Sequence, residues 1–303
     1  MTKHISQVFE VAGLRFEVIR PHDFELKKVL PSFVPFESEG KNMTHSACAI
    51  FSVTVVTTPI IIASDARYLT NFSGAFGDGC SLYESDGYYE IAVSYTTDGQ
   101  VSVMRVNRNF ESAEIYLNCE EPYNGYALSF FLMFVYAQRC VLFDTFLLHA
   151  SVVVKDGTGY AFMGKSGTGK STHSRLWLRS LENTSLLNDD NPAIRICRGT
   201  KEVKISGTPW SGKTPCYKNE TVKLGALVRL VQSSTNKYRE LNAFDAFLSI
   251  LAGCSGMRWN NDLYMALCDT LENVVQVMPT GELECLPEES AAELCYEQIK
   301  QKI

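Results

Sequence analysis

Several patterns typical of nucleic-acid-binding, zinc-binding and low-complexity proteins are missing from this 303-residue chain. The longest basic run is the pair Lys27-Lys28, and the net charge is −6. Both facts disfavour nucleic acid as a partner, because phosphate backbones are bound by clustered basic side chains. None of the 10 cysteines belongs to a C-x-x-C pair, which disfavours a zinc or redox site and predicts buried, reduced thiols. There are no internal repeats or low-complexity linkers.

Segments typical of secretion or of membrane insertion are also scarce. The N-terminal residues MTKHISQVFEV lack the apolar core of a signal peptide. The most apolar stretch, residues 122–138, is at the lower length limit for crossing a bilayer. It begins with Pro and Asn-Gly, and Arg139 and Asp144 follow closely. We therefore expect a buried helix over about residues 123–143, no membrane partner and a cytoplasmic location.

The first part of the chain has the pattern of a small antiparallel β-sheet that ends near Cys119. Asp86-Gly87 and Asp98-Gly99 are each flanked by alternating apolar and polar residues. Asp-Gly between such runs indicates a hairpin, because both turn positions need positive φ. We assign a β-rich N-terminal domain to residues 1–121 and a second domain to residues 122–303.

The second part alternates strands with helices and predicts an α/β fold. A strand that contains His149 is followed by a turn, a second strand over residues 160–164 and a glycine loop. Apolar residues at helical spacing then indicate a helix. A central strand, KLGALVRLVQ, and two helices over residues 243–252 and 261–277 come later.

The glycine loop reads GKSGTGKS and fits the phosphate-binding pattern G-x-x-x-x-G-K-[ST]. Its glycines let backbone N–H groups turn inward around phosphate oxygens, and the helix that follows adds its positive end. Lys170 would reach the β and γ phosphates of a nucleotide, and the Ser171 hydroxyl would bind Mg²⁺. The candidate nucleotide-binding residues are Gly164, Ser166, Gly167, Thr168, Gly169, Lys170, Ser171 and Thr172.

Two adjacent carboxylates, Asp189 and Asp190, end a short apolar strand about 20 residues after the loop. One of them can hold the metal while the other accepts a proton from an attacking hydroxyl. The residue pattern alone leaves open which of the two takes which role. The alternative is a solvated turn, since NDDNP has turn composition. His149, on the strand paired with the one that feeds the loop, is either a third member of the site or a core histidine.

The segment GTPWSGKTPCYKN, residues 207–219, is a candidate lid over the phosphates. Loops rich in Gly and Pro that carry a cation often close over phosphates. Lys213 would neutralise the transferring group and Trp210 would wall the pocket; the alternative is a connecting loop with a buried Trp anchor. Arg258 is a second candidate for the transition-state charge, against a surface ion pair.

The run LLHASVVVKDGTGYAFMGKSGTGKST, followed by LLNDD, resembles the ATP-binding core shared by HPr kinase/phosphorylase and phosphoenolpyruvate carboxykinase. In both groups a His-bearing strand is followed by a turn, a strand, the phosphate loop and an Asp-Asp pair. The resemblance covers about residues 147–303. It implies a nucleotide-binding core of this type, with ATP and Mg²⁺ as cofactors and with His149 and Lys170 as catalytic residues. Within the acid pair we favour Asp190 as the catalytic base and Asp189, with Ser171, as the metal ligand. Lys213, from the candidate lid, is added to these catalytic residues.

The resemblance further implies a kinase that transfers the γ-phosphoryl group of ATP to a hydroxyl on a protein serine, a peptide or a small molecule. The Glu-x-Arg-Gly pattern and the basic loop of HPr kinases are missing, which disfavours HPr as the acceptor. The further Lys and Arg of the carboxykinases have no match, which disfavours decarboxylation. The alternatives are a non-catalytic ATP-binding regulator and, less favoured, a carboxykinase-type enzyme. We expect the N-terminal domain to shape the acceptor site or to mediate assembly into a homo-oligomer.

Overall fold

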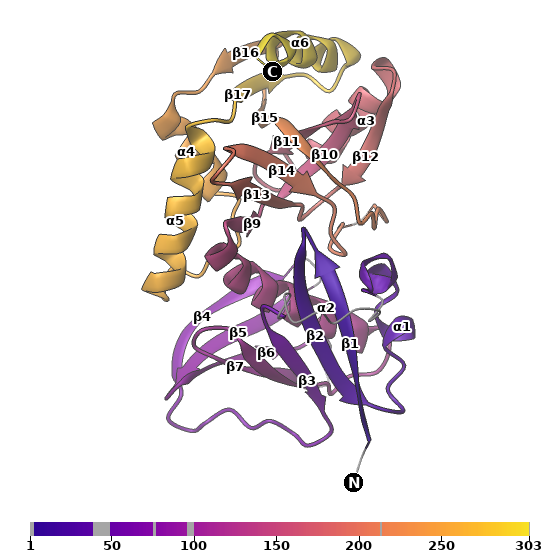
Figure 1. The fold of residues 1–303 in the computed structure, drawn as a ribbon, viewed down its shortest axis with the longest axis vertical. Helices are drawn as coiled ribbons and strands as arrows, with labels where there is room; N and C mark the ends of the chain where they lie inside the picture. Colours follow the sequence, from indigo (N-terminus) through magenta and orange to yellow (C-terminus); the bar gives the residue numbers. More distant parts are fainter. Residues whose placement is uncertain (1–2, 39–48, 75–76, 96–99, 213, 303) are drawn as a thin grey trace. The chain divides into compact units, whose positions relative to one another are not determined.

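The computed structural model describes residues 3–38, 49–74, 77–95, 100–212 and 214–302. It is a mixed α/β structure with two multi-stranded sheets (Figure 1). The chain divides into two compact units, Met1–Arg139 and Cys140–Ile303. This division comes after the apolar helix that the sequence assigned to the second domain. Helix α2 (Tyr123–Arg139) belongs to the first unit, where the Tyr136 hydroxyl donates a 2.9 Å hydrogen bond to the Val11 carbonyl.

The first unit contains an eight-stranded sheet in the order β1-β2-β3-β8-β7-β6-β5-β4. The hairpin predicted at Asp86-Gly87 joins β5 to β6, whereas the one predicted at Asp98-Gly99 lies outside the described residues. The sequence predicted an antiparallel sheet, but the sheet is mixed, because β3 pairs in parallel with both β2 and β8. The elements are β1 (His4–Val11), β2 (Leu14–Pro21), α1 (Leu26–Val29), η1 (Pro31–Phe36), β3 (Ser52–Val56), β4 (Arg67–Gly74), β5 (Gly77–Ser85), β6 (Tyr88–Val93), β7 (Ser102–Asn107) and β8 (Ser112–Tyr116).

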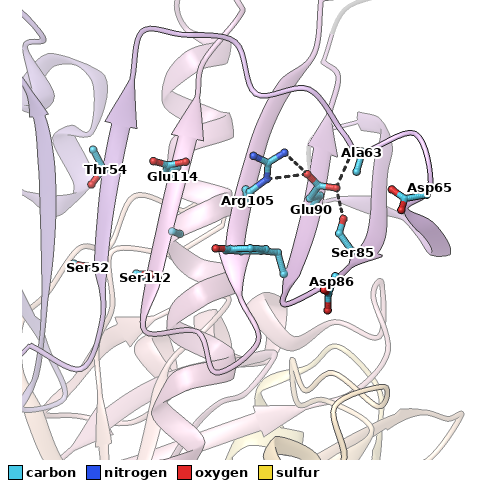
Figure 2. Close-up of a pocket in the computed structure, with 12 residues that line it drawn as sticks. Ser52, Thr54, Ala63, Asp65, Ser85, Asp86, Glu90, Arg105, Ser112 and Glu114 are labelled. Carbon is cyan, nitrogen blue, oxygen red and sulfur yellow. Dashed lines mark hydrogen bonds and ion pairs between the residues drawn. The ribbon is translucent and has the colours of Figure 1, made fainter.

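One face of this sheet carries a polar hollow of about 600 Å³. A row of directly paired residues crosses four strands here: Thr54, Glu114, Arg105 and Glu90 (Figure 2). The fully buried Glu90 carboxylate accepts hydrogen bonds from Arg105, from the Ser85 hydroxyl and from the Ala63 N–H. Burial raises the pKa of Glu90, but these hydrogen bonds outweigh burial and keep its pKa below the ordinary value.

The predicted buried helix forms as α2. Helix α2 and the 3₁₀ turn η2 (Cys140–Phe143) together form the segment Tyr123–Phe143. By length and composition alone, this segment could cross a membrane. Of the most apolar 18-residue window in this segment, 56% is buried inside the fold. The fully buried side chains of α2 include Phe131, Leu132 and Val135.

The second unit contains a nine-stranded sheet in the order β12-β10-β11-β15-β14-β13-β9, and β17 pairs with both β15 and β16. The predicted central strand is β15, whose 12 residues pair with β14 near their start and with β17 near their end. The strands are β9 (Thr145–Leu147), β10 (Ala150–Lys155), β11 (Thr158–Met163), β12 (Thr184–Asn188), β13 (Ala193–Cys197), β14 (Glu202–Ser206), β15 (Thr221–Gln232), β16 (Lys237–Glu240) and β17 (Thr280–Cys285).

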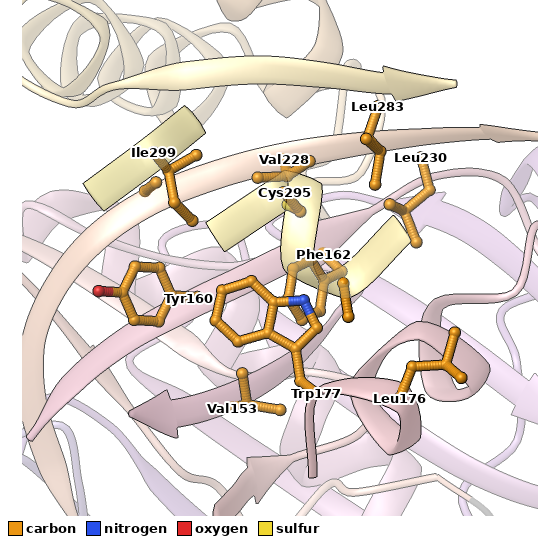
Figure 3. Close-up of a cluster of buried hydrophobic side chains, with 12 residues drawn as sticks. Val153, Tyr160, Phe162, Leu176, Trp177, Val228, Leu230, Leu283, Cys295 and Ile299 are labelled. Carbon is orange, nitrogen blue, oxygen red and sulfur yellow. The ribbon is translucent and has the colours of Figure 1, made fainter. Parts of the chain in front are cut away.

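Helix α3 (Lys170–Ser180), which follows the glycine loop, is fixed by a buried cluster that it shares with α6 (Glu289–Ile299). Trp177 of α3 lies among Tyr160, Phe162 and Cys295 in this cluster (Figure 3). Because packing at this density tolerates little displacement, the cluster sets where the first turn of α3 lies. The remaining helices are α4 (Ala243–Leu251), α5 (Asn261–Val275) and η3 (Lys300–Lys302).

His173 lies beside this cluster, on the first turn of α3. Its ring packs edge-on against Phe162, and the Trp177 indole N–H donates a 3.0 Å hydrogen bond to His173 Nε2. His173 Nδ1 has no hydrogen-bond partner among the described residues. Burial lowers the pKa of His173 to about 4. A proton on Nε2 would also break the bond from Trp177.

We predict that His173 makes the second unit less stable in mild acid. An unfolded histidine binds a proton below about pH 6.5, whereas His173 resists protonation down to about pH 4. The unfolded state therefore binds more protons between these values, and the free energy of unfolding falls as the pH drops through that window. His173→Gln should remove about 2 to 3 kcal/mol of this loss at pH 4.5.

Urea unfolding followed by Trp fluorescence at pH 7 and pH 4.5 measures this loss, since all 3 Trp residues lie in the second unit. His22→Gln, at an exposed histidine of the first unit, is the control. The same acid sensitivity in wild type and in His173→Gln would contradict the prediction.

Candidate active site

The pairing of β10 with both of its neighbours brings three sequence motifs to one end of the sheet. Ala150 of β10 pairs with Met163 of β11, and Val152 of β10 pairs with Asn188 of β12. His149 therefore lies next to the start of the glycine loop, and the acid pair follows β12 at the same end. The Ala150 N–H confirms this alignment by donating a 2.9 Å bond to the Asp190 carbonyl.

The sequence predicted His149 within a strand, but it lies in the two-residue gap, Leu148-His149, between β9 and β10. The Leu148 N–H donates to the Pro192 carbonyl, and the His149 N–H donates to the Gly253 carbonyl. These two bonds to loop carbonyls, with an isolated antiparallel bridge between Leu148 and Cys254, take the place of a continuous strand at this point. The break lets β9 pair with β13 while β10 pairs with β11 and β12.

The glycine loop has the backbone that its sequence predicted. Gly164, Gly167 and Gly169 have φ values of 151°, 82° and 97°, which favour glycine. A Cβ on Gly164 would lie 2.6 Å from the Thr168 hydroxyl oxygen and 3.2 Å from the Leu230 carbonyl oxygen. Helix α3 begins at Lys170 without a side-chain cap. Its first N–H groups are therefore available to an anion.

Lys170 connects this loop to His149. Its buried ammonium donates to the Gly164 carbonyl at 3.0 Å and to the Lys165 carbonyl at 3.4 Å, and it lies 2.9 Å from His149 Nε2. An ammonium has only donors, so Nε2 must accept and the proton of a neutral ring lies on Nδ1. Burial lowers the pKa of Lys170, and the charges of Asp190 and Asp189 oppose this effect.

Asp190 continues the chain of contacts from Lys170 through His149. Its Oδ1 lies 2.9 Å from His149 Nδ1, and its Oδ2 accepts a 2.9 Å bond from the Asn191 side-chain amide. Both oxygens of this carboxylate therefore have N–H donors. The backbone of Gly212, at a φ of 57°, also lies close to Asp190: a Cβ on Gly212 would come within 3.0 Å of the Asp190 Cβ.

Asp189 has hydroxyl donors instead. Ser151 Oγ donates to Asp189 Oδ1 at 2.6 Å, so the Ser174 hydroxyl, 2.6 Å from Ser151 Oγ, must donate to Ser151. Both serines are buried, and Ser174 belongs to α3. On the other oxygen, the exposed Thr214 hydroxyl donates to Oδ2 at 2.6 Å. Sequence reasoning missed all three residues; the one available signal was that Ser151 interrupts an apolar strand.

The segment predicted as a lid runs beside the acid pair. Trp210 is buried and its carbonyl accepts from the Asn191 N–H, so it anchors the loop. The buried Ser211 hydroxyl accepts from the Asp189 N–H at 3.2 Å. Lys213 lies outside the described residues. Arg258 is exposed on the connection between α4 and α5, and its predicted role stays a prediction.

The donor set suits a Mg²⁺ ion that arrives with a nucleotide better than a resident metal. Within the described ranges, no group of three or more His, Cys, Asp or Glu side chains could hold a metal. Mg²⁺ is usually bound by one or two carboxylates together with phosphates and waters. Asp189, Asp190 and the half-buried Ser171 at the start of α3 supply donors of this kind.

No protein-family model matches this chain, and no curated protein matches it. Among solved structures, it is similar to the HPr(Ser) kinase/phosphatase from Coxiella burnetii, with a TM-score of 0.30 and 15% sequence identity. The similarity covers 51% of this chain and 88% of that one. Because a TM-score this low does not show a shared fold, the function has to be inferred from the contacts of the site.

We predict that Gly164→Ala weakens Mg-ATP binding at least tenfold more than Gly167→Ala. Both glycines have positive φ, so both substitutions strain the backbone by about 1 to 3 kcal/mol. Only at Gly164 would the new Cβ collide with other atoms, since nothing lies within 4 Å of a Cβ at Gly167. Calorimetric titration measures the affinity and thermal unfolding checks the fold. Equal losses in the two variants would contradict the described loop geometry.

Proposed function

We propose that the chain is an ATP-dependent kinase that transfers the γ-phosphoryl group to a hydroxyl acceptor, on a nucleotide-binding core of the HPr kinase type. The observation that carries this proposal is the continuous contact from Lys170 through His149 to Asp190, directly beside an uncapped helix start. A phosphate-binding loop alone serves many functions. A loop lysine joined to a histidine and two carboxylates supports phosphoryl transfer to an acceptor that must lose a proton.

Lys170 is already held where phosphates would bind. Its ammonium donates to two carbonyls of the loop, which are neutral acceptors. Phosphate oxygens would replace them with negatively charged acceptors, so that both partners of each hydrogen bond would be ionised. The loop N–H groups and the start of α3 add further donors. Together they would hold the β and γ phosphates of ATP.

The contacts of the two carboxylates support a division of labour opposite to the one that the sequence favoured. Asp190 accepts from His149 and Asn191, and metal-binding carboxylates are usually oriented by such hydrogen bonds. Asp189 Oδ2 instead accepts from a hydroxyl on the exposed side, which is the group that an acceptor would bring. We therefore propose Asp189 as the proton acceptor and Asp190, with Ser171, as the Mg²⁺ ligand. When bound, Mg²⁺ neutralises charge on the transferring phosphoryl group.

We predict that Asp189→Asn lowers phosphoryl transfer on the order of a hundredfold or more, because an amide cannot accept the proton. Mg-ATP binding should change little in this variant, since the loop and Lys170 remain. Lys170→Ala should lose both binding and transfer. Transfer is measured with γ-labelled ATP and a cell extract as the source of acceptor, and binding by calorimetry.

Asp156→Asn is the matched control, because this exposed aspartate lies at the turn between β10 and β11. Its transfer and binding should equal those of the wild type. Full transfer by Asp189→Asn would refute the proposed base. A wild-type chain that binds Mg-ATP but labels no acceptor would instead support a non-catalytic nucleotide sensor.

A further inference from the structure

Thr214 occupies the place at the acid pair where an acceptor hydroxyl would bind. Its Oγ1 donates to Asp189 Oδ2 at 2.6 Å, and the residue is exposed. A hydroxyl bonded to a carboxylate that can take its proton is the arrangement of a nucleophile and its base. Resting on the kinase activity proposed above, we infer that this site phosphorylates its own Thr214.

The loop that carries Thr214 is fixed close to the acid pair on its N-terminal side. Trp210 is buried, and the Ser211 hydroxyl accepts from the backbone N–H of Asp189. Thr214, three residues after Ser211, thus stays at Asp189 without having to diffuse there. Holding a nucleophile in place by the same chain makes the transfer effectively unimolecular. A threonine that encounters the site only by diffusion lacks this advantage.

The neighbouring hydroxyls do not compete with Thr214. Ser151 and Ser211 also bond to Asp189, but both are buried, as is Ser174 behind them. A triphosphate bound at the glycine loop cannot approach a hydroxyl that is closed off from solvent. Of the described hydroxyls that contact Asp189, Thr214 is therefore the one open to the γ-phosphate.

The step balances with ATP as the co-reactant. Thr214 Oγ1 bonds to the γ-phosphorus while the bond from that phosphorus to the β–γ bridging oxygen breaks, and ADP leaves with that electron pair. The hydroxyl proton passes to Asp189 Oδ2 and then to water. The product is phosphothreonine with about −1.5 to −2 charge, directly beside two carboxylates. Because Thr214 has a single hydroxyl, the reaction stops at one phosphate per chain. Repulsion then moves the phosphothreonine away from Asp189 and leaves Asp189 open to an external acceptor.

The test incubates the purified full chain with Mg-ATP and follows phosphate incorporation by intact mass and peptide mapping. We expect one phosphate per chain, on Thr214, with an initial rate per chain that does not change over a tenfold dilution of the protein. Thr214→Val, which keeps the shape but removes the hydroxyl, should reduce incorporation to background. Thr214→Ser should retain it, and Thr200→Val, at an exposed threonine after β13, should behave as wild type.

Failure of this inference is distinguishable from failure of the proposed function. If the wild type binds Mg-ATP and labels an acceptor in extract but Thr214 carries no phosphate, self-phosphorylation is wrong and the kinase stands. Phosphate on another residue, or a rate per chain that rises with protein concentration, also overturns it. If the chain neither binds Mg-ATP nor transfers phosphate, both proposals are wrong.

Discussion

The candidate active site depends on one constraint: strand β10 is paired along both of its edges in a fixed register. Pairing with β11 sets His149 beside the glycine loop, and pairing with β12 sets Asp190 beside His149. A shift of one residue in either pairing would turn every side chain to the opposite face of the sheet. The buried cluster around Trp177 adds the position of α3, and with it Lys170 and Ser174.

The same constraint brings like charges together, and the contacts show how the fold tolerates them. Each of the four oxygens of Asp189 and Asp190 accepts a hydrogen bond, two from hydroxyls and two from side-chain N–H groups. The buried ammonium of Lys170 contacts His149, and His149 contacts Asp190. Attraction between Lys170 and the carboxylates therefore offsets part of their mutual repulsion. Lys170 balances one of the two carboxylates, so these three side chains together carry one negative charge. A divalent cation that accompanies a nucleotide complements that charge.

Local patterns in the sequence were enough to predict the glycine loop, the acid pair after β12 and the hairpin that feeds the loop, because turn glycines and strand periodicity are properties of neighbouring residues. The contacts of Ser151 and Thr214 with Asp189 were not predictable, since residues 25 to 38 positions apart meet only through tertiary packing. The parallel insertion of β3 and the break at His149 have the same origin: their partners are distant loops and strands. The apolar helix α2 was predicted, but not that it belongs to the first unit, because its composition does not specify which sheet it covers.

In the proposed complex the glycine loop, Lys170 and the acid pair all contact one bound triphosphate. Calorimetric titration with Mg-ATP, compared with AMP under the same conditions, tests it most directly, because AMP lacks the two phosphates that Lys170 would hold. We predict one Mg-ATP bound per chain, with an affinity at least a hundredfold higher than that for AMP, or about 2.7 kcal/mol in binding free energy. Equal affinities for the two nucleotides, or no heat with Mg-ATP, would contradict it.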